Sequence, residues 1–79
     1  MTIHVRLFAA LRELAGTSSL DASGRTVGEI TDALSAEHGE RFAKIAAVSS
    51  FVVNGDRAGR DTVIADGDEV AILPPVSGG

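Results

Sequence analysis

Cysteine, tryptophan and tyrosine are absent from this sequence of 79 residues, and three phenylalanines are its only large aromatic side chains. The absence of cysteine excludes disulfide bonds, cysteine-based zinc sites and a thiol nucleophile. The scarcity of aromatic rings argues against a surface on which nucleic-acid bases stack. Any sulfur chemistry in which this chain takes part must therefore use another of its groups.

Positive charge is also scarce, because 7 Lys and Arg residues stand against 11 Asp and Glu residues and give a formal net charge of −4. The basic residues are scattered along the chain, whereas a nucleic-acid-binding domain usually gathers them on one face. Long apolar runs are missing as well, so no segment is expected to span a membrane. The first residues, "MTIHVRLF", lack the basic start and apolar run of a signal peptide. We therefore expect a cytoplasmic protein with no nucleic-acid and no membrane partner.

The overall composition, 44% hydrophobic and 23% charged, is that of an ordinary globular domain. A chain of this length corresponds to one domain. No internal repeat or linker interrupts it, and only its last residues differ in kind. We predict a folded domain over residues 1–74 and an extended tail over residues 75–79.

The first part of the chain predicts a strand, a short helix and a second strand. Apolar residues alternate with others in "TIHVRLF", and this period of two is typical of a half-buried strand with Ile3, Val5 and Leu7 on its buried face. The segment "AALRELAG" has helical spacing and a stop at Gly16. The segment "TSSLDAS", anchored by Leu20, is a weaker strand.

The segment "TVGEITDALSAEHG" predicts the main helix. Thr26 followed three residues later by Glu29 is a capping box, in which each side chain can accept a backbone N–H near the start of the helix. Gly39 suits a left-handed helix stop, and "ERFAKIAAVSS" beyond it predicts another helical turn or two. The apolar stripe of the main helix, which should pack on the sheet, consists of Val27, Ile30 and Leu34.

The last part of the chain predicts a hairpin and a final strand. "FVVNG" reads as a strand that runs into a tight turn, because Asn-Gly tolerates the positive φ angles that such a turn demands. In the final strand, Val70 and Ile72 face one way while Leu73 faces the other. The order of elements predicts an α+β fold, a mixed sheet with the main helix packed across one face. We expect the β-grasp fold of ubiquitin, with the first and last strands adjacent and parallel and a flexible C-terminal Gly-Gly tail.

Few residues of the domain predict chemistry by themselves. His4 and His38 lie in different elements and no cysteine accompanies them, so we expect no metal site. Asp66, Asp68 and Glu69 are too few for a calcium loop and are expected to form a turn. The sequence has no catalytic serine motif and no phosphate-binding glycine loop. The chain's own residues therefore do not predict an enzyme.

The end of the chain, "LPPVSGG", points to function. Its two prolines fix φ and lack N–H donors, so they end the last strand and direct the chain outward. Its two glycines carry no Cβ and can enter a passage too narrow for any other residue. The printed sequence ends there, which leaves a carboxylate on Gly79. Instead of a frayed terminus, we predict an arm that another protein takes up, whose partner-binding residues are Pro74, Pro75, Val76, Ser77 and Gly78.

Such an arm needs a docking surface beside it, because ordering each flexible residue costs about 1–2 kcal/mol. Alternation places Phe8 and Leu73 outside the core, close to Pro74, and an exposed apolar group of this kind marks an interaction site. We predict that these three residues contact the partner. For Phe8, the alternative is a second small core under the helix of residues 9–16.

Three stretches of the sequence look like those of known proteins: "RLFAALRELAG" near the start, "VNG" in the middle and "DGDEVAILPPVSGG" at the end. Together they resemble the MoaD/ThiS family of ubiquitin-like sulfur carriers over nearly the whole chain. The resemblance is greatest to the MoaD branch, the small subunits of molybdopterin synthase. ThiS-like carriers generally lack the double proline and the block "FAALRELAG".

The resemblance implies a mechanism. In this family a MoeB-like activating enzyme uses ATP to adenylate the C-terminal carboxylate, here that of Gly79, and a sulfurtransferase supplies the sulfur that makes it a thiocarboxylate. The carrier itself binds no cofactor, and the catalytic residues are expected on a MoaE-like large subunit, which forms a heterotetramer with it. The sulfur then goes to the pterin precursor in molybdenum cofactor biosynthesis. A carrier for thiamin thiazole or cysteine biosynthesis, or a ubiquitin-like modifier of protein amines, stays open as an alternative.

Overall fold

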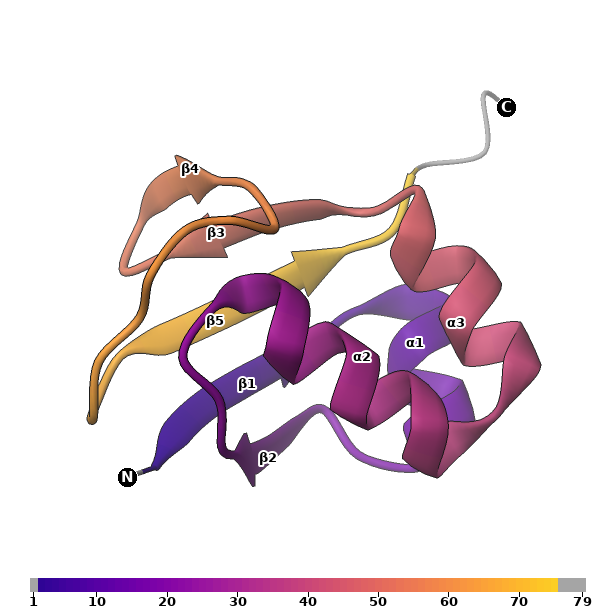
Figure 1. Cartoon of the computed structure of the whole chain (residues 1–79). Coiled ribbons are helices and arrows are strands. Elements are labelled where there is room, and N and C mark those ends of the chain that lie inside the picture. The colour runs from indigo at the N-terminus through magenta and orange to yellow at the C-terminus, as the bar shows by residue number, and fades with distance from the viewer. Residues whose placement is uncertain (1, 76–79) are drawn as a thin grey trace.

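A mixed five-stranded sheet forms the body of the protein (Figure 1). The computed structural model describes residues 2–75. The strand order is β2-β1-β5-β3-β4, in which β1 and β5 pair in parallel and the other neighbours pair antiparallel. This is the predicted β-grasp arrangement, with the first and last strands adjacent. The strands are β1 (Ile3–Leu7), β2 (Ser19–Ala22), β3 (Ser50–Val53), β4 (Asp56–Ala58) and β5 (Glu69–Leu73).

The helices lie together on one side of the sheet (Figure 1). Between residues 2 and 75 they are α1 (Ala9–Ala15), α2 (Val27–His38) and α3 (Glu40–Ala47). The main helix is α2, as predicted, and α3 is the expected additional turn or two. None of these helices is long and apolar enough to cross a membrane.

The core lies between the sheet and the helices. Alternation in β1 is confirmed, because Ile3 and Val5 are fully buried while His4 and Arg6 are exposed. In β5, Val70 and Ile72 are buried in the same way. The helices contribute Leu11, Val27, Ile30, Leu34, Phe42 and Ala46 to the same cluster.

Two glycines end helices. Gly16 has the left-handed φ of 76° and ψ of 12°, and its N–H donates to the carbonyl of Arg12, as expected of a helix stop. Gly39 also has a positive φ, 102°, but its ψ of −178° is extended. The left-handed conformation predicted for Gly39 is therefore wrong, because α3 begins at the next residue and the chain must change direction there.

The predicted cap of α2 is present, with one change of partner. The backbone N–H of Glu29 donates to Oγ1 of Thr26 at 3.1 Å. The Glu29 carboxylate accepts the N–H of Arg25, also at 3.1 Å, one residue before the position that a capping box would use. The cap therefore holds both the first turn of α2 and the residue that leads into it.

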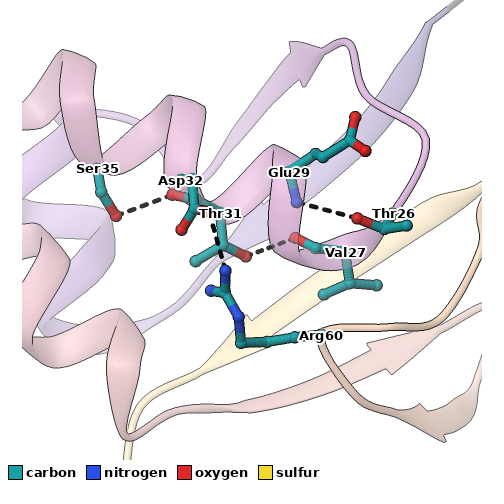
Figure 2. Close-up of polar contacts among 7 residues, drawn as sticks. All are labelled: Thr26, Val27, Glu29, Thr31, Asp32, Ser35 and Arg60. Carbon is teal, nitrogen blue, oxygen red and sulfur yellow. Dashed lines mark hydrogen bonds and ion pairs between the residues drawn. The ribbon is translucent and has the colours of Figure 1, made fainter.

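A loop from the far end of the chain completes this helix start. In this loop, residues 59–65 and here called the cap loop, the carbonyls of Thr62 and Arg60 accept the N–H groups of Val27 at 3.1 Å and Gly28 at 2.8 Å. Figure 2 shows Arg60 reaching to Asp32, where Nη2 and Oδ2 are 2.9 Å apart. This hydrogen bond, together with the charge of Asp32, raises the pKa of Arg60. The free N–H groups of a helix start are thus satisfied within the domain.

Candidate functional site

The described chain ends where β5 leaves the sheet. Leu73 is the last residue of the strand and pairs with Ser50 of β3. After it, Pro74 is half-buried and Pro75 is exposed, and neither can extend the ladder because proline has no N–H. Figure 1 shows this exit beside the C-terminal end of α3. The rest of the predicted arm, Val76, Ser77, Gly78 and Gly79, lies outside the described residues.

Phe8 and Leu73 lie at neighbouring positions at this end of the sheet. The parallel register pairs Leu7 with Ile72, so Phe8, which follows β1, is next to Leu73, the last residue of β5. Both side chains are half-buried, and neither belongs to the core or to the half-buried residues that pack against it. The predicted placement outside the core is confirmed, and α1 directs Leu11, not Phe8, into the core. Their contact with a partner stays a prediction, and we call Phe8, Leu73 and Pro74 the exit patch.

A cation lies over the aromatic ring of the exit patch. The guanidinium carbon of Arg6 is 5.8 Å from the centroid of the Phe8 ring, within the range of about 6 Å in which cation–π attraction acts. This contact of Arg6 with the exit patch was not among the predictions from the sequence. Its signal was the spacing Arg-x-Phe in a predicted strand, because residues two apart on a strand share a face.

The two histidines have separate environments. His4 Nδ1 lies 2.9 Å from Oδ1 of Asp21, its neighbour across the β1–β2 pair. His38, near the end of α2 as predicted, has its ring centroid 5.3 Å from that of Phe42. Its Nε2 is buried and has no hydrogen-bond partner among residues 2–75. In the same range, no three His, Cys, Asp or Glu side chains gather in a group that could hold a metal ion.

The acidic cluster forms a turn, as predicted. The Asp68 carboxylate accepts hydrogen bonds from the backbone N–H of Ala65 at 2.7 Å and from the side-chain amide of Asn54 at 2.9 Å. These bonds, above all the one from Ala65, lower the pKa of Asp68 because they stabilise its charged form. The Asn54 side chain also accepts the N–H of Glu69 at 2.9 Å. The cluster therefore ties the β3–β4 hairpin to the start of β5 and is structural.

Comparison with known proteins identifies the family of this chain. A family model described as the ThiS family matches residues 5–79, nearly the whole chain. This chain belongs to the MoaD/ThiS family of ubiquitin-like sulfur carriers. The resemblance noted in the sequence is thereby confirmed.

Two relatives within this family differ in name. The molybdopterin synthase sulfur carrier subunit of Aedes aegypti is 34% identical over 89 residues, which cover 98% of this chain and 88% of that protein. Small archaeal modifier protein 1 of Haloferax volcanii is 39% identical over 88 residues, which cover 94% of this chain and 97% of that protein. Both alignments thus cover nearly all of this chain.

Solved structures of family members have the same fold. SAMP1 from Haloferax volcanii superposes with a TM-score of 0.81 at 33% identity and covers 100% of both chains. A chain of the Amycolatopsis orientalis BexX/CysO complex gives 0.80 at 30% identity, with 98% of this chain and 99% of that chain covered. A chain of the complex of subunits 1 and 2 of molybdopterin-converting factor from Helicobacter pylori gives 0.69 at 24% identity over 100% of both chains, which supports the fold alone.

Proposed function

We propose that this family member is the sulfur carrier subunit of molybdopterin synthase. The observation that supports this most directly is the relative from Aedes aegypti, which has that name and is 34% identical across 98% of this chain. The exit patch adds a physical reason, because Phe8, Leu73 and Pro74 offer apolar contact surface at the point where the described chain leaves the sheet.

In this proposal the reactive group is the carboxylate of Gly79. A carboxylate is anionic at neutral pH and therefore a poor electrophile. The activating enzyme joins it to the AMP part of ATP, pyrophosphate leaves, and the carbonyl carbon becomes open to attack. Hydrosulfide from the sulfur donor then displaces AMP and leaves a thiocarboxylate. Its sulfur forms a bond to the pterin precursor on the large subunit, and water then cleaves the bond between acyl carbon and sulfur and regenerates the Gly79 carboxylate. The chain is a co-substrate that binds no cofactor, and the activating enzyme consumes the ATP.

The arm reaches these active sites only if the domain docks beside them. Ordering each residue from Pro75 onward costs about 1–2 kcal/mol. Full burial of a large apolar side chain contributes about 1.5–3 kcal/mol. Phe8 and Leu73 are already half-buried, so each contributes roughly half of that on docking. The exit patch therefore offsets the ordering of only one or two residues, and contacts along Val76, Ser77 and Gly78 must supply the rest.

Intact-mass analysis of the protein from its native cells tests the carrier step. We expect a species in which one oxygen is replaced by one sulfur, and fragmentation should assign the sulfur to Gly79. A variant that lacks Gly79 is the matched control and should contain no such species. Absence of the sulfur-containing form from cells that are making molybdenum cofactor would contradict the proposal.

A second function has a specific observation in its favour. Small archaeal modifier protein 1 is 39% identical to this chain, somewhat more than the Aedes relative. In a modifier, a protein amine captures the same activated carboxyl, so the product is an isopeptide-linked adduct. A carrier for another pathway, as the relation to the BexX/CysO complex would suggest, keeps the thiocarboxylate and differs in the sulfur acceptor.

Genetic complementation separates these candidates. Deletion of the gene should abolish molybdenum cofactor, and the native chain should restore it, whereas the variant without Gly79 should not. If the deletion strain still makes the cofactor, and the native strain contains proteins covalently linked to Gly79, the modifier is favoured. If the deletion strain still makes the cofactor, and the native strain contains a thiocarboxylate at Gly79, another sulfur pathway is favoured.

A further inference from the structure

The sequence contains a single side-chain amide, at a position where amides are chemically least stable. Asn54 is the only asparagine, there is no glutamine, and Gly55 follows it. The backbone nitrogen of a glycine in this position can attack the side-chain carbonyl carbon of the asparagine, because no Cβ on the glycine hinders the approach. Both residues are exposed in the turn between β3 and β4. The pair that forms the turn is therefore also open to covalent change.

The reaction is a deamidation. The nitrogen of Gly55 forms a bond to Cγ of Asn54 and gives up its proton, while the bond from Cγ to the amide nitrogen breaks and ammonia leaves. The product is a cyclic succinimide. Water then opens the ring at either carbonyl carbon and leaves an aspartate or an isoaspartate, whose main chain runs through the former side chain. The reaction consumes only water and needs no oxidant or cofactor.

Hydrogen bonds hold the Asn54 side chain away from this attack. Its Nδ2 donates to Oδ1 of Asp68 at 2.9 Å, and its Oδ1 accepts the backbone N–H of Glu69, also at 2.9 Å. The backbone N–H of Asn54 donates to the Glu69 carbonyl at 2.9 Å. These bonds run to the start of β5, which lies on one side of β3, whereas the chain turns at Gly55 toward β4 on the other side. The amide is thus directed away from the nitrogen that would attack it.

Asp68 is a well-placed acceptor for this amide. Its Oδ2 accepts the backbone N–H of Ala65 at 2.7 Å, which leaves Oδ1 for Asn54. The bond from Ala65 and then the bond from Asn54 lower the pKa of Asp68, so its carboxylate is charged at neutral pH. A hydrogen bond to a charged acceptor is stronger than one between neutral groups. The bond to Asp68 therefore contributes strongly to the protection of Asn54.

Deamidation removes this link to β5. An aspartate at position 54 has an oxygen in place of the donating NH2, so two carboxylates face each other where a hydrogen bond of 2.9 Å stood. Like charges at so short a distance repel. An isoaspartate instead lengthens the main chain of a two-residue turn whose geometry matches the twist of the hairpin. Either product separates the β3–β4 hairpin from the start of β5.

We propose that Asn54 is a deamidation site controlled by the fold: its hydrogen bonds to Asp68 and Glu69 protect the amide in the folded chain, and a chain that opens at this turn is converted and does not re-form the link to β5. Figure 1 shows the β3–β4 turn at the end of the sheet opposite the point where the described chain leaves β5. The modification therefore leaves the exit patch unchanged and lowers the stability of the domain that carries it. Neither step involves Gly79, so deamidation is independent of the carrier function.

The experiment follows the mass of the full chain during incubation at neutral pH, with and without guanidinium chloride. Because Asn54 is the only side-chain amide, a mass gain that corresponds to replacement of NH2 by OH arises there, and peptide fragmentation distinguishes aspartate from isoaspartate. We expect the folded native chain to deamidate more slowly than the unfolded one by a factor on the order of ten or more, because the hydrogen bonds that must break add to the barrier.

Asp68→Ala removes the acceptor of the Asn54 amide, and Asp66→Ala is the matched control. Asp66 belongs to the same acidic turn and also accepts a backbone N–H, but that bond, of 2.6 Å, comes from Thr2. We expect Asp68→Ala to deamidate about tenfold faster than the native chain, the factor that corresponds to the loss of about one hydrogen bond to a charged group. Asp66→Ala should deamidate at the native rate. Circular dichroism and thermal melting confirm that each variant is folded.

Asn54→Asp imitates the modified chain. Its melting temperature at neutral pH should lie about 4–8 °C below that of the native chain, the shift that loss of about one such bond causes in a domain of this size. The difference should shrink in strong acid, where both carboxyl groups are protonated. A native melting temperature of Asn54→Asp at neutral pH would overturn the loss of the link to β5.

The deamidation rates decide the rest. If the chain in guanidinium chloride gains no mass, Asn54 is not a deamidation site. If the native chain deamidates equally fast folded and unfolded, a comparison that requires no variant, the fold does not protect the amide. If folded Asp68→Ala loses its amide no faster than Asp66→Ala, the bond to Asp68 is not what protects Asn54, and the proposed control is wrong.

Discussion

Replacing Leu73 by aspartate tests the exit patch with little change to the fold. Leu73 is the last residue of β5 and lies half-buried outside the core, in register with the exposed Ser50. An aspartate there can keep its charge in water while the carrier is free. We expect Leu73→Asp to fold and to bind the large subunit of molybdopterin synthase much more weakly than the native chain.

The magnitude follows from the burial of this side chain. Complete burial of a leucine contributes about 1.5–3 kcal/mol. Since Leu73 is already half-buried, docking removes only the remaining half from water, worth about 1 kcal/mol. A carboxylate buried without a partner adds a penalty of several kcal/mol. Because about 1.4 kcal/mol corresponds to a tenfold change in affinity, Leu73→Ala should weaken binding up to about tenfold and Leu73→Asp more than about 100-fold.

Titration calorimetry against the large subunit measures these affinities, and thermal melting reports on the fold. Val63→Asp is the matched control. Val63 is also an apolar residue, 77% exposed, but it belongs to the cap loop and pairs with Thr26 at the start of α2 instead of lying in the exit patch. It should bind like the native chain. An unfolded Leu73→Asp protein would show that Leu73 supports the core, and native affinity in a folded one would remove it from the interface.

Three further predictions concern the arm, a helix cap and a turn. Deletion of Gly79, or addition of one residue after it, should abolish adenylation and thiocarboxylate formation with no change in melting temperature. The reason is that a displacement of the reacting group by about 1 Å can cost on the order of 10²-fold in rate. An extended protein that forms thiocarboxylate with its extra residue still attached would refute the inserted arm. Thr26→Ala should lower the free energy of unfolding by about 1 kcal/mol in denaturant titrations, whereas Thr26→Ser should retain most of it. The lowered pKa of Asp68 stabilises the fold above the ordinary aspartate pKa of about 3.9, and this contribution is lost as pH falls through the lower folded-state value. Asp68→Asn should therefore lower the melting temperature at neutral pH and much less in strong acid, and an equal loss at both would contradict this account.

Local patterns were sufficient to predict the elements of the fold and the exit patch. The period of two in β1 places Ile3 and Val5 in the core and leaves Phe8 outside it, and this depends only on the residues of that strand. The same holds for Leu73 at the end of β5. The Asn54-Gly55 turn was predictable for a similar reason, because its positive φ angles of 50° and 89° are those that a tight hairpin demands.

Contacts between distant segments could not be predicted in this way. The contact of His4 with Asp21 depends on the register of β1 against β2, which no local pattern states. Likewise, the bonds from the cap loop to the start of α2 join parts of the chain whose proximity only the complete fold determines. Such contacts arise from long-range pairing, which sequence periodicity does not encode.

The central position of β5 ties the folding of this protein to the completeness of its chain. β5 lies between β1 and β3, although it is the last of the strands within residues 2–75 to be synthesised. Until synthesis has passed Leu73, β1 and β3 have no common neighbour and expose unpaired edges, and the core lacks Val70 and Ile72. We therefore expect a product terminated before β5 to be unfolded and open to proteases, so that it does not compete for the partners of the native carrier.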